Sequence, residues 1–131
     1  AGLGLLDVDT VLAGDKTTVA AAGRHVLTGE AVEGYEIHLG RTAGADCVRP
    51  FVDLGGRSDG ARSADGLVGG TYVHGIVAAD AFRRAFLAQL GAPPSDFRYE
   101  AAVEATLDGL ADHLEKHVDI DRLLTIAGLR R

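Results

Sequence analysis

A histidine followed directly by a glycine ends an apolar stretch in the middle of the chain. Residues 69–75 read GGTYVHG, with His74 as the only imidazole among them. Because the unperturbed pKa of histidine lies near neutrality, an imidazole at the end of a strand can act as a general base. In open α/β sheets, ligands bind beyond such strand ends. The alternative is a structural histidine that caps the strand through a backbone hydrogen bond, and the residues alone leave both interpretations open.

A second stretch gathers four chemically useful side chains within seven positions. Residues 34–42 read GYEIHLGRT and carry Tyr35, Glu36, His38 and Arg41. In a strand, Glu36 and His38 share one face, so both can line one pocket. The guanidinium of Arg41 can hold a carboxylate through two parallel hydrogen bonds. The alternative is a surface strand whose polar side lies in water.

The remaining candidate groups carry weaker signals. Cys47 is the only cysteine and has no glycine neighbours, whereas a nucleophile elbow has the form G-x-C-x-G. We therefore expect Cys47 to have no catalytic role. His113 and His117 lie four residues apart on an expected helix, but HLEKH is not the HExxH motif, so we expect no metal site. His25 is placed in a polar turn and given no role.

Composition excludes several classes of protein. The net charge is −6 over 131 residues, and the chain has no basic stripe, so we expect no nucleic-acid partner. No apolar run is long enough to suggest a membrane span, so we expect no membrane partner. A single cysteine permits no intrachain disulfide, which agrees with an expected cytoplasmic location.

The elements that must position these side chains change character along the chain. Period-2 alternation, β-branched residues and turn residues predict strands over residues 2–11, 16–22, 32–42 and 67–73, with loops over 44–50 and 54–65. Helical spacing predicts three helices: one capped by Asp80, one from Ser95 or Asp96 to His117, and one capped by Asp119. The fold class is therefore α/β, with strands in the first two thirds and helices in the last third.

Three segments together resemble cobyric acid synthases in order and spacing. They are GLGLLDVDTV (residues 2–11), GYEIHLGRT (34–42) and DGARSADGLVGGTYVHG (59–75). The tail from residue 80 to residue 128 is similar to the C-terminal helices of the same family. GYEIHLGRT and GTYVHG carry most of the specificity, since related amidotransferases share GLGLL.

The resemblance implies a fold and an activity. The family joins an ATP-using synthetase domain, which needs ATP and magnesium, to a class I-like glutamine amidotransferase domain with an open sheet. That domain hydrolyses glutamine at a cysteine paired with a histidine, and the ammonia amidates side-chain carboxylates of a corrinoid in cobalamin biosynthesis. The catalytic histidine of the family falls on His74. Tyr35, Glu36, His38 and Arg41 become candidates for the substrate pocket or for the interface with the synthetase domain.

The resemblance also defines what we expect this chain to lack. In the family the nucleophile precedes GLGLL, so residues 1–131 should be the C-terminal part of the glutaminase domain, without the elbow. No GxxxxGK[ST] motif is present for ATP. We expect the chain alone to bind no cofactor, to be inactive, and to associate through exposed surfaces. The alternatives are a cobyrinate diamide synthase, the glutaminase partner of a cell-wall amidating pair, and a catalytically dead binding module.

Overall fold

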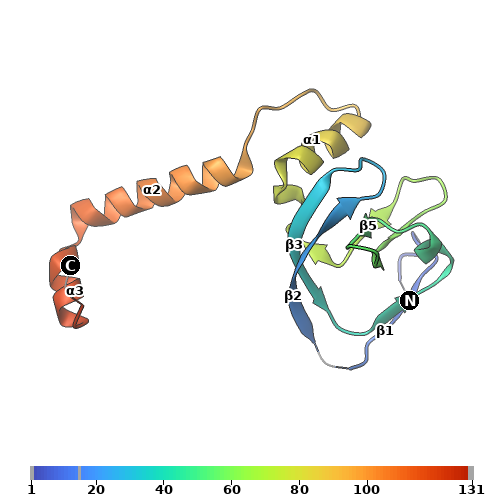
Figure 1. Cartoon of the computed structure of the whole chain (residues 1–131), viewed down its shortest axis with the longest axis horizontal. Coiled ribbons are helices and arrows are strands. Elements are labelled where there is room, and N and C mark those ends of the chain that lie inside the picture. The colour runs from blue at the N-terminus through green and yellow to red at the C-terminus, as the bar shows by residue number, and fades with distance from the viewer. Residues whose placement is uncertain (1, 15, 130–131) are drawn as a thin grey trace. The chain divides into compact units, whose positions relative to one another are not determined.

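The computed structural model describes residues 2–14 and 16–129. They form two compact units, one ending at Asp96 and the other beginning at Phe97. Strands dominate the first unit and helices the second, which confirms the predicted α/β class (Figure 1). None of the helices described is long and apolar enough to cross a membrane.

Short strands and turns make up most of the first unit. The strands are β1 (Asp9–Val11), β2 (Thr17–His25), β3 (Ala31–His38), β4 (Arg41–Ala43), β5 (Val52–Asp53), β6 (Ser58–Asp59), β7 (Ala61–Arg62), β8 (Gly69–Gly70) and β9 (Val73–His74). The helices are η1 (Ala45–Val48), η2 (Ile76–Ala78), α1 (Asp80–Gln89), α2 (Tyr99–His117) and α3 (Ile120–Ile126), of which η1 and η2 are short 3₁₀ turns.

The main sheet is antiparallel throughout its described ladders. Its strand order is β6-β5-β2-β3-β9, with a long β2–β3 hairpin at its centre. β1 pairs with β4 and β7 with β8 in two smaller sheets. Because none of the ladders among the described residues is parallel, the binding rule for the carboxyl ends of parallel strands does not by itself place a ligand at His74.

The hydrophobic core lies on one face of this sheet, which we call the inner face. Val32, Val52 and Val73 pack there with Phe82 of α1. The opposite, outer face of β2 and β3 carries exposed residues: Thr18, Ala20, Ala22, Glu33 and Tyr35. Since side chains alternate along a strand, successive residues of β3 serve different faces.

The expected strand over residues 32–42 is in fact two strands. β3 ends at His38 and β4 begins at Arg41, in a different sheet. Gly40, between them, has φ 108°, and a Cβ there would lie 2.3 Å from the carbonyl oxygen of Val11. A bend that only glycine adopts without strain therefore divides the segment.

The single continuous strand expected over residues 67–73 is wrong. Leu67 is 84% exposed. Gly69–Gly70 pairs with β7, and Val73–His74 pairs with β3, so the stretch joins two sheets. The break lies at Thr71 and Tyr72, which both hydrogen-bond to the carboxylate of Asp59.

The other predicted boundaries hold in part. Among residues 2–11 only Asp9–Val11 forms a strand, whereas the strand expected over 16–22 runs from Thr17 to His25. The loop expected over 44–50 contains η1, and the loop expected over 54–65 contains the short strands β6 and β7.

Two of the three helix starts differ from the expectation. Asp80 is the first residue of α1 rather than its cap, and its carboxylate instead pairs with Arg83 at 2.5 Å. α2 begins at Tyr99, a few residues later than expected. The cap at Asp119 is confirmed, because its carboxylate accepts the backbone N–H of Arg122 at 3.0 Å.

Candidate functional site

His74 lies on β9, at one edge of the main sheet. Its backbone is paired with Tyr35 of β3, and the two rings stack with centroids 5.5 Å apart and 8° between their planes. Both side chains are exposed on the outer face. The imidazole is therefore oriented by an aromatic neighbour and is accessible from outside the sheet.

A glycine on β3 permits this close approach of the two strands. A Cβ on Gly34 would lie 2.0 Å from the carbonyl oxygen of His74. A side chain at position 34 would therefore push β9 away from β3. The glycine that opens GYEIHLGRT serves the placement of His74 rather than a turn.

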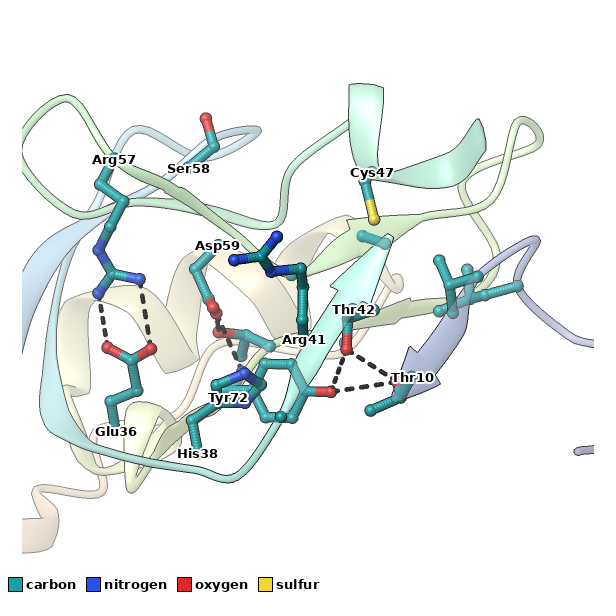
Figure 2. A pocket seen from close by; sticks show the side chains of 17 residues that line it. Thr10, Glu36, His38, Arg41, Thr42, Cys47, Arg57, Ser58, Asp59 and Tyr72 are labelled. Carbon is teal, nitrogen blue, oxygen red and sulfur yellow. Dashed lines mark hydrogen bonds and ion pairs between the residues drawn. The ribbon is translucent and has the colours of Figure 1, made fainter. Parts of the chain in front are cut away.

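A cavity of about 470 Å³ lies on the inner side of β3 (Figure 2). Glu36, His38 and Arg41 line it, whereas Tyr35 and His74 do not. The prediction that Glu36 and His38 lie on one face of the strand is confirmed. Tyr35 lies on the other face, where its ring stacks on His74. The predicted site residues form two groups on opposite faces of β3.

One wall of the cavity holds a bidentate ion pair. Two nitrogens of Arg57 lie 3.2 and 2.5 Å from the two carboxylate oxygens of Glu36. Glu36 is buried, at 9% exposure, so the pair lies partly out of water. The hydrogen bonds to Glu36 raise the pKa of Arg57, and the negative charges of Glu36 and Asp59 raise it further. The alternative of Glu36 as a solvated surface residue is wrong.

Asp59 is buried and also lines the cavity. Its Oδ2 accepts the Thr71 hydroxyl at 2.5 Å and the backbone N–H of Tyr72 at 2.9 Å. The carboxylate thereby fixes the segment that leads into β9. Asp59 links the inner cavity to the strand that carries His74.

Three hydroxyl groups meet at the far end of the cavity. The oxygen atoms of Thr10 and Thr42 are 2.8 Å apart, and the Tyr72 hydroxyl lies 2.5 Å from that of Thr42. The His38 ring packs edge-on against Tyr72 with centroids 4.1 Å apart, and its Nδ1 is buried without a hydrogen-bond partner in the described structure.

Cys47 also lines the cavity, from the 3₁₀ turn η1. It does not stand between a strand and an α-helix, as a nucleophile elbow requires. This setting supports the expectation that Cys47 is not the nucleophile.

The histidine pair on α2 forms no larger cluster. The rings of His113 and His117 stack with centroids 4.3 Å apart, and Nδ1 of His117 lies 2.8 Å from the carbonyl oxygen of His113. Within residues 2–14 and 16–129, no three side chains of the histidine, cysteine or carboxylate type form a metal-binding group. The expectation that the chain has no metal site stays a prediction.

His25 was wrongly assigned to a polar turn. It is fully buried at the end of β2, among the rings of Phe51, Phe82 and Phe86. Burial lowers the pKa of His25, and the positive charge of Arg62 lowers it further.

Arg57 and Asp59 were missed as site residues because the sequence around them indicates only turns. Their partners, Glu36 and Thr71, lie 21 and 12 residues away along the chain. No local sequence pattern predicts contacts between residues so far apart along the chain. Two opposite charges that flank a serine in a glycine-rich segment are nevertheless a signal that these residues are candidates for a site.

Comparison with known proteins places the sequence of this chain in a family. A sequence model of the CobB/CobQ-like glutamine amidotransferase domain matches residues 1–82. Proteins named cobyric acid synthase from Cereibacter sphaeroides, Ruegeria sp. and Bradyrhizobium diazoefficiens are 58%, 55% and 49% identical, over 96%, 97% and 96% of this chain. The matched region is 26% of each relative, so the chain spans about a quarter of their length. No solved structure matches.

Proposed function

Because this chain belongs to the family of CobB/CobQ-like glutamine amidotransferase domains, we propose that it is part of a glutamine-hydrolysing cobyric acid synthase. In this proposal, ammonia released from glutamine amidates side-chain carboxylates of a corrinoid in cobalamin biosynthesis. The observation that carries it is the identity of 49–58% to proteins of that name, sustained over nearly the whole chain.

His74 is the residue that we assign to the chemistry of glutamine hydrolysis. Its imidazole would take the proton from a cysteine thiol and later give it to the departing ammonia. Two features support this role: the ring is exposed rather than buried, and its plane is held by stacking on Tyr35. Tyr35 then acts as a positioning residue, since it touches the base and not the reacting atoms.

The outer face of the sheet offers room for the thiol to approach. Beside Tyr35 on the neighbouring strand lie the small side chains of Ala20 and Ala22, both exposed. A cysteine on an elbow could therefore reach His74 from this side without first displacing a large side chain. Cys47 lines the cavity on the other side of β3, so it does not fill this role.

The amidation step belongs to a separate part of the proposed enzyme. Amide formation from a carboxylate and ammonia requires activation of the carboxylate, for which ATP and magnesium are the expected co-reactants. The chain carries no GxxxxGK[ST] loop, and we assign none of its residues to ATP.

The test compares two nitrogen sources in the complete synthase that carries this chain. His74→Ala should lower the glutamine-dependent amidation rate by about 10²–10⁴-fold, the usual cost of losing a general base. The rate with added ammonia should largely survive, since free ammonia enters after the step that needs the base.

His113→Ala provides the matched control, because that histidine lies on an exposed part of α2. Both of its rates should stay close to those of the unchanged enzyme. An equal fall of both rates in His74→Ala would contradict the assignment, because it would mean that His74 is structural or serves the amidation step.

A further inference from the structure

The strand that carries His74 has a short ladder. β9 is two residues long and lies at one edge of the main sheet. Its ladder with β3 consists of two residue pairs, Tyr35 with His74 and Glu36 with Val73. A slip of one residue would turn the His74 side chain from the outer face to the inner face and end its stacking on Tyr35. Because so short a ladder fixes the register weakly, contacts from outside it decide where the imidazole lies.

One such contact comes from Asp59, the last residue of β6. Its Oδ2 accepts the Thr71 hydroxyl at 2.5 Å and the backbone N–H of Tyr72 at 2.9 Å. The Thr71 hydroxyl oxygen in turn accepts the backbone N–H of Val73 at 3.1 Å. Hydrogen bonds to an ionised carboxylate are stronger than those between neutral groups. A single buried carboxylate therefore holds the segment that enters β9.

A second contact comes from Arg57, two residues before Asp59. Its guanidinium binds both carboxylate oxygens of Glu36 on β3, as the two dashed lines in Figure 2 show. Glu36 is also the residue that pairs with Val73 across the β3–β9 ladder. The negative charge of Asp59 attracts the same guanidinium. Residues 57–59 are thus attached to β3 at one end and to the entry of β9 at the other.

We propose that residues 57–59 position His74, with Arg57 fixing this segment to β3 and Asp59 fixing the start of β9. The inference rests on the proposed role of His74 as the general base and adds two positioning residues to it. Arg57 and Asp59 line the cavity on the inner side of β3, whereas the imidazole lies on the outer face. They therefore act through the backbone of β9 and do not touch the reacting atoms.

The exposure of Arg57 separates positioning from overall stability. Its side chain is 57% exposed, and ion pairs of exposed side chains contribute little to the stability of a fold. We therefore expect Arg57→Gln to leave the protein folded. A displacement of a catalytic group by about 1 Å can nevertheless lower a rate about 10²-fold. The effect of this substitution should consequently appear at His74 rather than in the unfolding transition.

The first measurement follows the imidazole itself, in the complete synthase labelled with ¹³C at the histidine Cε1 atoms. The signal of His74 is the one that disappears in His74→Ala. Stacking on Tyr35 shifts its Hε1 signal upfield, because the ring current of the tyrosine shields protons above its face. Tyr35→Leu marks the unstacked position. We expect Arg57→Gln and Asp59→Ala each to move the signal toward that position.

The second measurement compares reaction rates in the same enzyme. Arg57→Gln and Asp59→Ala should each lower the glutamine-dependent kcat by about 10–100-fold, with the KM for glutamine within about twofold of its original value. The ammonia-dependent rate should be unchanged. Asp59→Asn keeps an oxygen that can accept from Thr71 and Tyr72, so its kcat should lie closer to that of the unchanged enzyme.

Arg49→Gln is the matched control. Arg49 also forms an ion pair with a buried carboxylate, that of Asp46, and it donates to the carbonyl oxygen of Arg62 at 3.0 Å. These contacts join η1 to β7 and lie outside the β3–β9 ladder. The variant should therefore lose an ion pair of the same kind while the His74 signal and both rates stay unchanged.

Three results would overturn the proposal. An unchanged His74 signal in Arg57→Gln would show that the segment does not position the ring. An equal displacement in Arg49→Gln would show that any lost ion pair has this effect. A raised KM with an unchanged kcat would mean that Arg57 binds the substrate. If His74 is not the general base, its own substitution will fail the test of two nitrogen sources, whereas the position of its signal still tests the role of residues 57–59.

Discussion

The buried histidine in the core should make the stability of the fold depend on pH. The backbone N–H of Thr28 donates to Nδ1 of His25 at 3.2 Å, so the proton of the neutral ring belongs on Nε2. Nε2 is buried and has no hydrogen-bond partner within the described residues. A second proton would therefore add a charge among three phenylalanine rings, and burial accordingly lowers the pKa of His25.

The sign and size of the effect follow from linkage. Below a pH of about 6.5 the unfolded chain binds a proton at His25 that the folded chain does not, so the unfolding free energy falls as the pH falls. If the ring stays neutral in the fold, the loss between pH 7.5 and pH 5.5 is about 1.4 kcal/mol from this group. This contribution is fully present above the unfolded pKa and is lost progressively below it.

Urea unfolding followed by circular dichroism at pH 7.5, 6.5 and 5.5 measures the effect. The matched variant is His25→Asn, whose side-chain oxygen can still accept from Thr28. It should be less stable at pH 7.5 by roughly 2–4 kcal/mol, because it leaves a cavity between the rings. It should also lose about 1.4 kcal/mol less than the unchanged chain on going to pH 5.5. The same pH dependence in both proteins would refute the reasoning.

Three further substitutions test individual contacts. Gly34→Ala should displace β9, destabilise the fold by about 1–3 kcal/mol in a thermal melt, and lower glutamine-dependent activity more than ammonia-dependent activity, since the new Cβ meets the His74 carbonyl. Thr71→Val should cost about 1–3 kcal/mol in urea unfolding, because the buried Asp59 carboxylate loses a hydrogen bond; an unchanged midpoint would show that the bond contributes nothing. Asp119→Ala should cost about 1 kcal/mol of helix stability, visible as faster amide exchange in α3 than in α2.

The sequence predicted those parts of the site that depend on local alternation. In residues 34–38, period 2 placed Glu36 and His38 on one face, and the structure has this arrangement. Periodicity gives the sides of a strand, but it does not say which side faces the interior. A polar face normally indicates solvent, and here it faces the cavity because Arg57, from a distant turn, neutralises Glu36.

Features that depend on distant segments could not be predicted in this way. The stretch from residue 67 to residue 73 has the composition of a strand, but Asp59 divides it by binding Thr71. His25 stands next to Arg24 and close to Thr28, which suggest a surface turn. Its burial comes from Phe51, Phe82 and Phe86, which reach it from separate elements.

The division of β3 between two faces sets a limit on how the length of this segment can change. Tyr35 and Glu36 are neighbours in sequence, yet one stacks on His74 and the other lines the cavity. Inserting a single residue before position 35 would slip the register by one and exchange the two faces for every residue that follows. Inserting two residues would return each following side chain to its original face, but every one of these side chains would be displaced by two positions along the strand. We therefore expect that natural length changes within this strand add or remove an even number of residues. Single-residue insertions should be tolerated only in the turns on either side.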